Sequence, residues 1–130
     1  MHPPVTAIYA ALLAFLYIRL SVAVIANRRR SKIALGTGAD PLLERASRVH
    51  ANFAEYTPLA LILLFLLESS GYPAWVIHSL GAPFLAARCL HAYGLAQDPE
   101  NFRFRSIGMI ATFLVLIVSA ALLLLGFVLR

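Results

Sequence analysis

"RVHANFAEYTPLALILLFLL", residues 48–67, is the most informative stretch for the fold, because an apolar run of membrane length begins here among polar side chains. A helix needs about 20 residues to cross a hydrocarbon core of about 30 Å. Residues 49–67 meet that length, provided that Asn52 and Glu55 are tolerated inside the span. Polar groups at membrane depth are tolerated when they face a bundle interior, pair, or line a wet cavity. The stretch therefore predicts a membrane helix with a polar surface near its start.

The rest of the chain predicts three more spans, at residues 5–26, 72–96 and 107–129. Of the 130 residues, 61% are apolar and only 13% are charged, and the mean hydropathy is +0.80, far from a soluble protein. In lipid, backbone groups must be satisfied within a helix or a closed barrel, and the alternation typical of a barrel is absent. The first run lacks the features of a cleaved signal and is expected to stay as a span. We predict an all-α integral membrane four-helix bundle, a single domain over residues 1–130.

Charge indicates the topology of this bundle. Six basic residues lie in the first connection and the helix start that follows it: Arg28, Arg29, Arg30, Lys32, Arg45 and Arg48. The second connection, 68–73, has no Lys or Arg, whereas the third, 97–106, has two. Basic residues that flank spans are first a topology signal, so the net charge of +5 does not indicate nucleic acid. We predict that the first and third connections are cytoplasmic and that both termini lie outside.

Three local signals set the helix boundaries. Asp40-Pro41 reads as an N-cap followed by a proline at the first helical position, so a helix is expected to start near Pro41. "ESSGYP", residues 68–73, is short enough to require an antiparallel helical hairpin. Asp98-Pro99 is expected to form a turn or a cap before the last helix. At the outer end, Glu68 and His78 are expected to be solvated.

The polar residues of the opening stretch share one face. At about 100° per residue, Arg48, Asn52 and Glu55 fall within about 60° of arc. In one interpretation Arg48 and Glu55 neutralise each other, and Asn52 holds helices together. In the other they form a polar ligand site that offers a guanidinium to a carboxylate, a carboxylate to an ammonium and an amide to an amide.

The third span contributes polar residues at the same depth and on the same membrane side. Arg88 and His91, three positions apart, share a face, whereas Tyr93 is turned towards a different neighbour. The simpler interpretation is that Arg88 snorkels and Tyr93 belongs to an interfacial aromatic belt. The alternative is that they join the stripe in binding a ligand.

The fourth span opens with Arg103, Arg105 and Ser106. Cations at a helix N-terminus oppose the macrodipole, so Arg105 requires another reason for its place, such as topology or an anion. The four histidines and one cysteine are scattered, so no metal site is expected.

Three motifs together resemble the MAPEG family, membrane-associated proteins in eicosanoid and glutathione metabolism. They are Arg-x3-Asn-x2-Glu-x2-Pro at 48–58, "ARCLHAYG" at 87–94 and "RFRS" at 103–106. The form of the first motif looks like the small bacterial branch, which implies a bacterial inner membrane protein. The resemblance also implies a homotrimer of four-helix protomers, with glutathione bound as a cosubstrate between neighbouring subunits near the cytoplasmic face.

The resemblance also implies roles for individual residues. Those matching Arg48, Asn52 and Glu55 contact glutathione, and the further candidate binding residues are Arg88, His91, Tyr93 and Arg103. Arg105 is the candidate for stabilising the thiolate, with Ser106 as an alternative, although spacing leaves Arg103 and Arg105 both open. A guanidinium beside a thiol of pKa about 8.5 favours the thiolate, which is the nucleophile.

The implied function is that of a glutathione transferase or peroxidase that acts on apolar electrophiles or lipid hydroperoxides entering from the membrane. The family's third-helix pattern is matched incompletely, because Tyr93 aligns with its tyrosine only after a shift of a residue or two. The family also includes a nonenzymatic member that binds lipid. A nonenzymatic lipid-binding or scaffold protein of the same fold is therefore the alternative.

Overall fold

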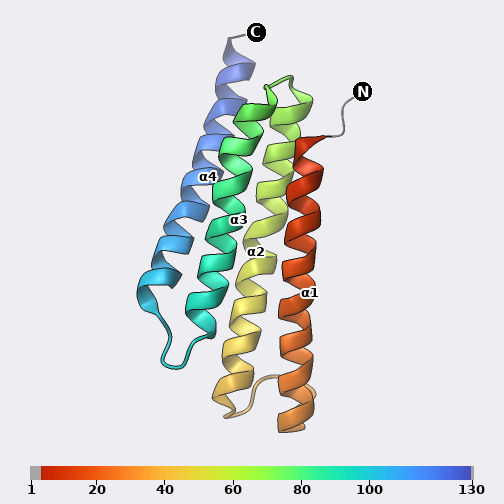
Figure 1. The fold of residues 1–130 in the computed structure, drawn as a ribbon, viewed down its shortest axis with the longest axis vertical. Coiled ribbons are helices and arrows are strands. Elements are labelled where there is room, and N and C mark those ends of the chain that lie inside the picture. Colours follow the sequence, from red (N-terminus) through yellow and green to blue (C-terminus); the bar gives the residue numbers. More distant parts are fainter. Residues whose placement is uncertain (1–3, 130) are drawn as a thin grey trace.

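In the computed structural model, which describes residues 4–129, the chain forms four long helices that lie side by side (Figure 1). They are α1 (Val5–Ser31), α2 (Pro41–Ser69), α3 (Ala74–Ala96) and α4 (Phe102–Val128). Successive helices run in opposite directions, so the two ends of the chain lie at the same end of the bundle. The described chain contains no strand, and the all-α bundle predicted from the sequence is confirmed.

The two middle helices hold the bundle together. α2 and α3 pack against each other, and both α1 and α4 pack against this pair. The core between them is aromatic and aliphatic and includes Leu13, Phe53, Leu64, Ile77 and Phe84. The outer faces of α1 and α4 are also apolar, with Phe15 70% and Ile117 64% exposed. A helix that is apolar on its outer as well as its inner face belongs in lipid.

Three helices of the described chain, α1, α2 and α4, are long and apolar enough to cross a membrane. They contain the expected spans 5–26, 49–67 and most of 107–129. The fourth expected span, 72–96, corresponds to α3, whose 23 residues include Arg88, Pro83 and two histidines and do not reach the same mean hydropathy. α3 lies alongside the other helices in the middle of the bundle (Figure 1).

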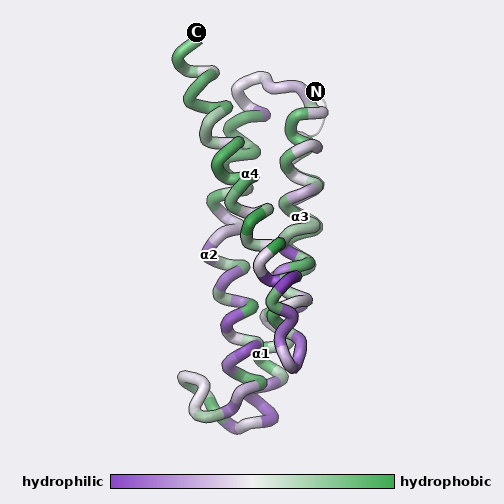
Figure 2. Tube along the Cα trace, turned by 90° about the vertical axis from the view of Figure 1, so that its left-hand side faces the viewer, coloured by the Kyte–Doolittle hydropathy of each residue, from purple (hydrophilic) through white to green (hydrophobic). Residues whose placement is uncertain are grey.

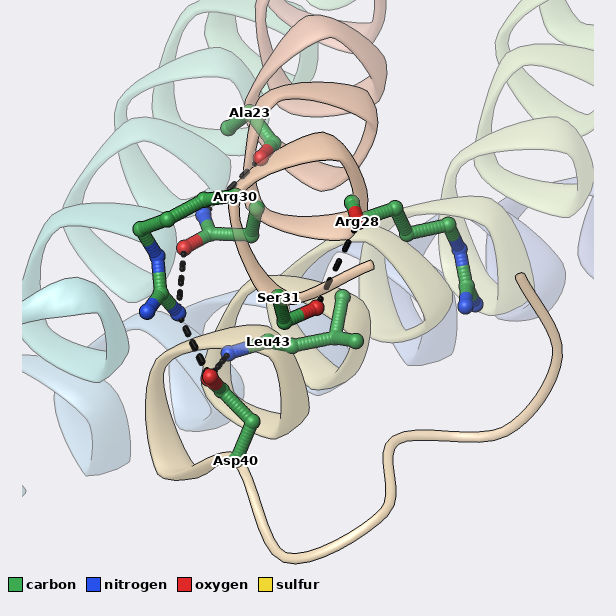
Figure 3. A network of polar contacts seen from close by, with 7 residues as sticks. Ala23, Arg28, Arg30, Ser31, Asp40 and Leu43 are labelled. Atoms are coloured by element: carbon green, nitrogen blue, oxygen red, sulfur yellow. Dashed lines mark hydrogen bonds and ion pairs between the residues drawn. The ribbon is translucent and has the colours of Figure 1, made fainter. Parts of the chain in front are cut away.

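The start of α2 is fixed as the sequence predicts. Asp40 is the N-cap residue, its Oδ1 accepts a hydrogen bond from the Leu43 N–H at 2.8 Å, and Pro41 follows it. Arg30 reaches the same carboxylate from the last turn of α1, with 2.7 Å between Nη2 and Oδ1 (Figure 3). The Leu43 N–H, and after it Arg30, lowers the pKa of Asp40 below its ordinary value of 3.8. This network joins the end of α1, which runs on to Ser31, to the start of α2.

The other connections differ in part from the prediction. Gly71, with φ of +87°, lies in the short connection that makes α2 and α3 the expected antiparallel hairpin. Asp98-Pro99 lies in a bend, but the cap of α4 is Asn101, whose side chain accepts from the Phe104 N–H at 3.1 Å. Asp98 instead pairs with Arg45 of α2, with 3.2 Å between Nη1 and Oδ1.

At the terminal end of the bundle, the expectation that Glu68 is solvated is wrong. Its carboxylate accepts hydrogen bonds from the backbone N–H groups of Val5 and Thr6, the latter at 2.9 Å. Nearby, the Tyr9 hydroxyl is 2.8 Å from Nδ1 of His78. The first N–H groups of a helix lack partners within it and attract negative charge, and the end of α2 supplies that charge to α1.

Candidate functional site

Hydrophilic residues gather towards the end of the bundle opposite the termini, as Figure 2 shows. The start of α2, the end of α3 and the start of α4 meet there, because the helices alternate in direction. All the residues that the sequence proposed for a site lie on these three segments. The site is therefore built from one end of three packed helices.

On α2, the proposed stripe divides between the outside and the inside of the bundle. Arg48 and Glu55 are exposed, whereas Asn52 between them is half-buried. Within residues 4–129, neither Arg48 nor Glu55 makes a hydrogen bond or an ion pair, so the two charges do not neutralise each other. The α2 surface thus presents an open guanidinium and an open carboxylate.

On α3, Arg88 and His91 point into the bundle and Tyr93 points out of it. Arg88 is 0% exposed and His91 1%, whereas Tyr93 is 58% exposed and packs beside the Phe104 ring at 6.0 Å between centroids. The shared face of Arg88 and His91 is confirmed. The interpretation of Arg88 as a snorkelling side chain is wrong, because its charge is buried between helices.

Arg88 joins all three site helices. Its Nη2 donates to Oδ1 of Asn52 on α2 at 2.5 Å, and its Nη1 donates to Oγ1 of Thr112 on α4 at 3.3 Å. Its guanidinium carbon lies 5.9 Å from the ring centroids of both Phe53 and Tyr56. Hydrogen bonds and ring faces offset much of the cost of burying the cation.

The α3–α4 contact beneath this arginine is close. A Cβ added to Gly108 would lie 2.7 Å from the Ala87 carbonyl oxygen and 2.7 Å from the His91 Cβ. Any side chain at Gly108 would push the two helices apart. Thr112, one turn further along α4, donates its hydroxyl to the Gly108 carbonyl at 2.8 Å. Its oxygen therefore keeps its lone pairs for Arg88.

At the start of α4, Arg105 is half-buried and Arg103 is exposed. Arg105 forms an ion pair with Glu100, with 3.0 Å between Nη1 and Oε2, whereas Arg103 has no ion-pair partner in the described part of the chain. Ser106 is half-buried. The Glu100 pair supplies the anion that the position of Arg105 required.

Sequence reasoning missed Glu100, Thr112 and Tyr56. Glu100 lies in a connection, and no helical spacing relates it to Arg105. Thr112 and Tyr56 look like ordinary residues of apolar helices, and only the depth of Arg88 gives them a role. A buried arginine needs acceptors and aromatic faces, and that requirement is the one signal that would have directed a search to them.

Helices of membrane length, apolar outer faces and an open polar surface at one end define an all-α integral membrane protein. The model of the MAPEG family matches residues 6–125. The chain is 37% identical over 113 residues to the inner membrane protein YecN of Escherichia coli (strain K12), and the match covers 87% of this chain and 85% of that relative. The protein of the same name from Escherichia coli O6:H1 matches to the same extent. The chain belongs to the MAPEG family, as the resemblance of its motifs implied.

Proposed function

We propose that this protein binds glutathione at the open α2 surface and uses it to attack apolar electrophiles that enter from the membrane. The observation that carries the proposal is the exposure of Arg48 and Glu55 without a partner in the described chain, on either side of Asn52. Unpaired charges near membrane depth are costly, so their presence favours a ligand of matching charge. Glutathione matches, because it carries two carboxylates, one ammonium and two amides.

Arg105 is the residue proposed to hold the reacting sulfur as a thiolate. The thiol proton leaves to solvent, the thiolate forms a carbon–sulfur bond with the electrophile, and the leaving group departs with its electron pair. In the peroxidase reaction, two glutathione molecules reduce one hydroperoxide to an alcohol and water and become a disulfide. In the structure the Arg105 guanidinium is paired with the Glu100 carboxylate, and we propose that the thiolate replaces this carboxylate when glutathione binds.

The remaining parts of the proposal concern assembly and location. An α2 surface that is open in one protomer is completed by a neighbouring subunit, as in the homotrimer that the family resemblance implies. Because α1 and α4 are apolar outside, the second substrate reaches this surface from lipid. The named relative is an inner membrane protein, and we propose the same location, with the basic end of the bundle in the cytoplasm.

Glutathione titration of the purified protein by calorimetry tests binding, and turnover with an aryl halide and with a lipid hydroperoxide tests catalysis. We expect binding together with turnover of at least one substrate. Binding without turnover of either would leave a glutathione site and reject the enzyme. No binding would favour the nonenzymatic lipid-binding or scaffold alternative, in which the polar residues join subunits.

A further inference from the structure

The orientation of the Asn52 amide follows from its contact with Arg88. A guanidinium carries only donors, so Oδ1 of Asn52, and not Nδ2, must face it, and the structure places Oδ1 against Nη2 of Arg88. The amide NH2 group therefore points away from Arg88. Within residues 4–129 this NH2 group has no hydrogen-bond partner. The Asn52 side chain is half-buried, but its Nδ2 is not one of the side-chain atoms that are buried without a partner.

Arg88 is itself held from three sides and cannot easily turn. Oγ1 of Thr112 on α4 accepts a hydrogen bond from Nη1 of Arg88 at 3.3 Å, and the rings of Phe53 and Tyr56 flank the guanidinium. Thr112 has its own hydroxyl committed to the Gly108 carbonyl, so the direction of every bond in this chain is fixed. A rigid, fully buried donor thus determines what the α2 surface shows to a ligand.

We infer that Arg88 is a positioning residue that presents Asn52 to the ligand as an N–H donor. The inference rests on the proposed function and deepens it. Along α2 the ligand meets a guanidinium, an amide N–H and a carboxylate over about 10 Å, given a rise of about 1.5 Å per residue. The ligand class is a zwitterion with an anionic group facing Arg48, a carbonyl or carboxylate acceptor facing Asn52 and an ammonium facing Glu55. An orientation set before binding costs no ordering on binding.

Two readouts test this in the full-length protein: the side-chain amide 15N–1H signals of Asn52 without ligand, and the glutathione Kd. In Arg88→Met we expect the amide signals to shift and average and the Kd to weaken about tenfold, since the group loses its fixed orientation. Arg88→Lys, which keeps a charge and a donor, should recover part of both. Ser119→Ala removes another buried polar group of α4 and is the matched control, expected to change neither. Unmoved amide signals or an unchanged Kd in Arg88→Met would overturn the inference.

Asn52→Asp provides a second test that does not remove the buried cation. The new carboxylate can still accept from Arg88, but it presents oxygen where the ligand needs a donor, so the glutathione Kd should weaken by about tenfold or more. Binding equal to wild type would contradict the assigned donor role. If the wild-type protein itself binds no glutathione, the proposed function fails. The amide signals of Arg88→Met then still decide whether Arg88 positions Asn52.

Discussion

The two ends of the bundle differ in one respect: within the described chain, the end opposite the termini also carries charged side chains that have no partner. At the terminal end, the Glu68 carboxylate accepts hydrogen bonds from two backbone N–H groups of α1, and His78 is hydrogen-bonded to Tyr9. At the other end, Arg48 and Glu55 are exposed and have no partner in the described chain. The start of a helix requires acceptors whatever the protein does, whereas no contact within residues 4–129 requires Arg48 or Glu55. The difference indicates that the paired groups stabilise the fold, whereas Arg48 and Glu55 are available to a ligand.

The largest effect is expected at the open end, from Arg105→Ala. If its guanidinium stabilises the thiolate, kcat should fall about 100-fold, the usual loss when one charge-stabilising donor is removed. Steady-state kinetics with an aryl halide measures this, and Arg103→Ala is compared with it, because Arg103 lies on the same turn, is exposed and has no ion-pair partner within residues 4–129. A loss in Arg103→Ala with normal kcat in Arg105→Ala would assign the role to Arg103.

Glu55→Gln should affect ligand binding and leave folding alone. A charge-assisted hydrogen bond contributes about 1.5–3 kcal/mol, so the Kd for glutathione should weaken about 10- to 100-fold. The Tm should not change, because Glu55 has no partner within the described protomer. Calorimetry measures the Kd and thermal denaturation measures the Tm. The control is Glu44→Gln, which changes another exposed acidic residue of α2. A lower Tm with unchanged Kd would make Glu55 a subunit contact and would remove the contrast between the two ends.

Glu68→Ala should have the reverse pattern at the closed end. It leaves the first N–H groups of α1 without their acceptor, so the free energy of unfolding should fall by about 1–3 kcal/mol. Glutathione affinity of the folded protein should be unchanged. Glu68→Gln keeps one acceptor oxygen and should lose less. Denaturation in detergent measures the loss, and a weaker Kd with no loss of stability would show that the terminal end also serves the ligand.

The smallest effect on stability is expected at Asp40, which has hydrogen-bond partners although it lies at the basic end of the bundle. Its pKa is lowered on folding, by the Leu43 N–H and then by Arg30, so its contribution to stability is complete above the unfolded pKa. That contribution should be lost as the pH falls through the lowered pKa, below about pH 4. The protection of the Leu43 amide, which is the slowing of its hydrogen exchange relative to an unstructured chain at the same pH, should therefore fall there in wild type. Asp40→Asn keeps a cap acceptor without the titration, and an equal acid response in both would contradict the assignment.

Much of the fold could be predicted because its causes are local. Apolar runs of membrane length, the Asp40-Pro41 start and the short 68–73 connection each act within a few residues, and the structure has all three. The contacts of Glu68 cannot be predicted in this way, because its partners, Val5 and Thr6, are more than 60 residues away in the chain. The sequence predicts only a turn or cap at Asp98 for a similar reason, since its partner Arg45 lies on α2.

The candidate site was predictable in its composition but not in its arrangement. Helical geometry places Arg48, Asn52 and Glu55 on one stripe, and the motif adds the expectation of glutathione. Residue spacing does not predict that Arg88 donates a hydrogen bond to Asn52, or that Glu100 forms an ion pair with Arg105. Those pairings depend on how α2, α3 and α4 are rotated against one another.

By itself, the sequence determined the class of protein, the number of helices and the residues that could carry chemistry. Hydropathy, helical periodicity and capping act over short distances, so they can be read from the order of residues. Which polar groups have partners within the described chain, and which are exposed without one, depends on the tertiary structure. That outcome depends on packing between helices: α3 and α4 approach closely at Gly108, and the buried Arg88 contacts Asn52 on α2 and Thr112 on α4.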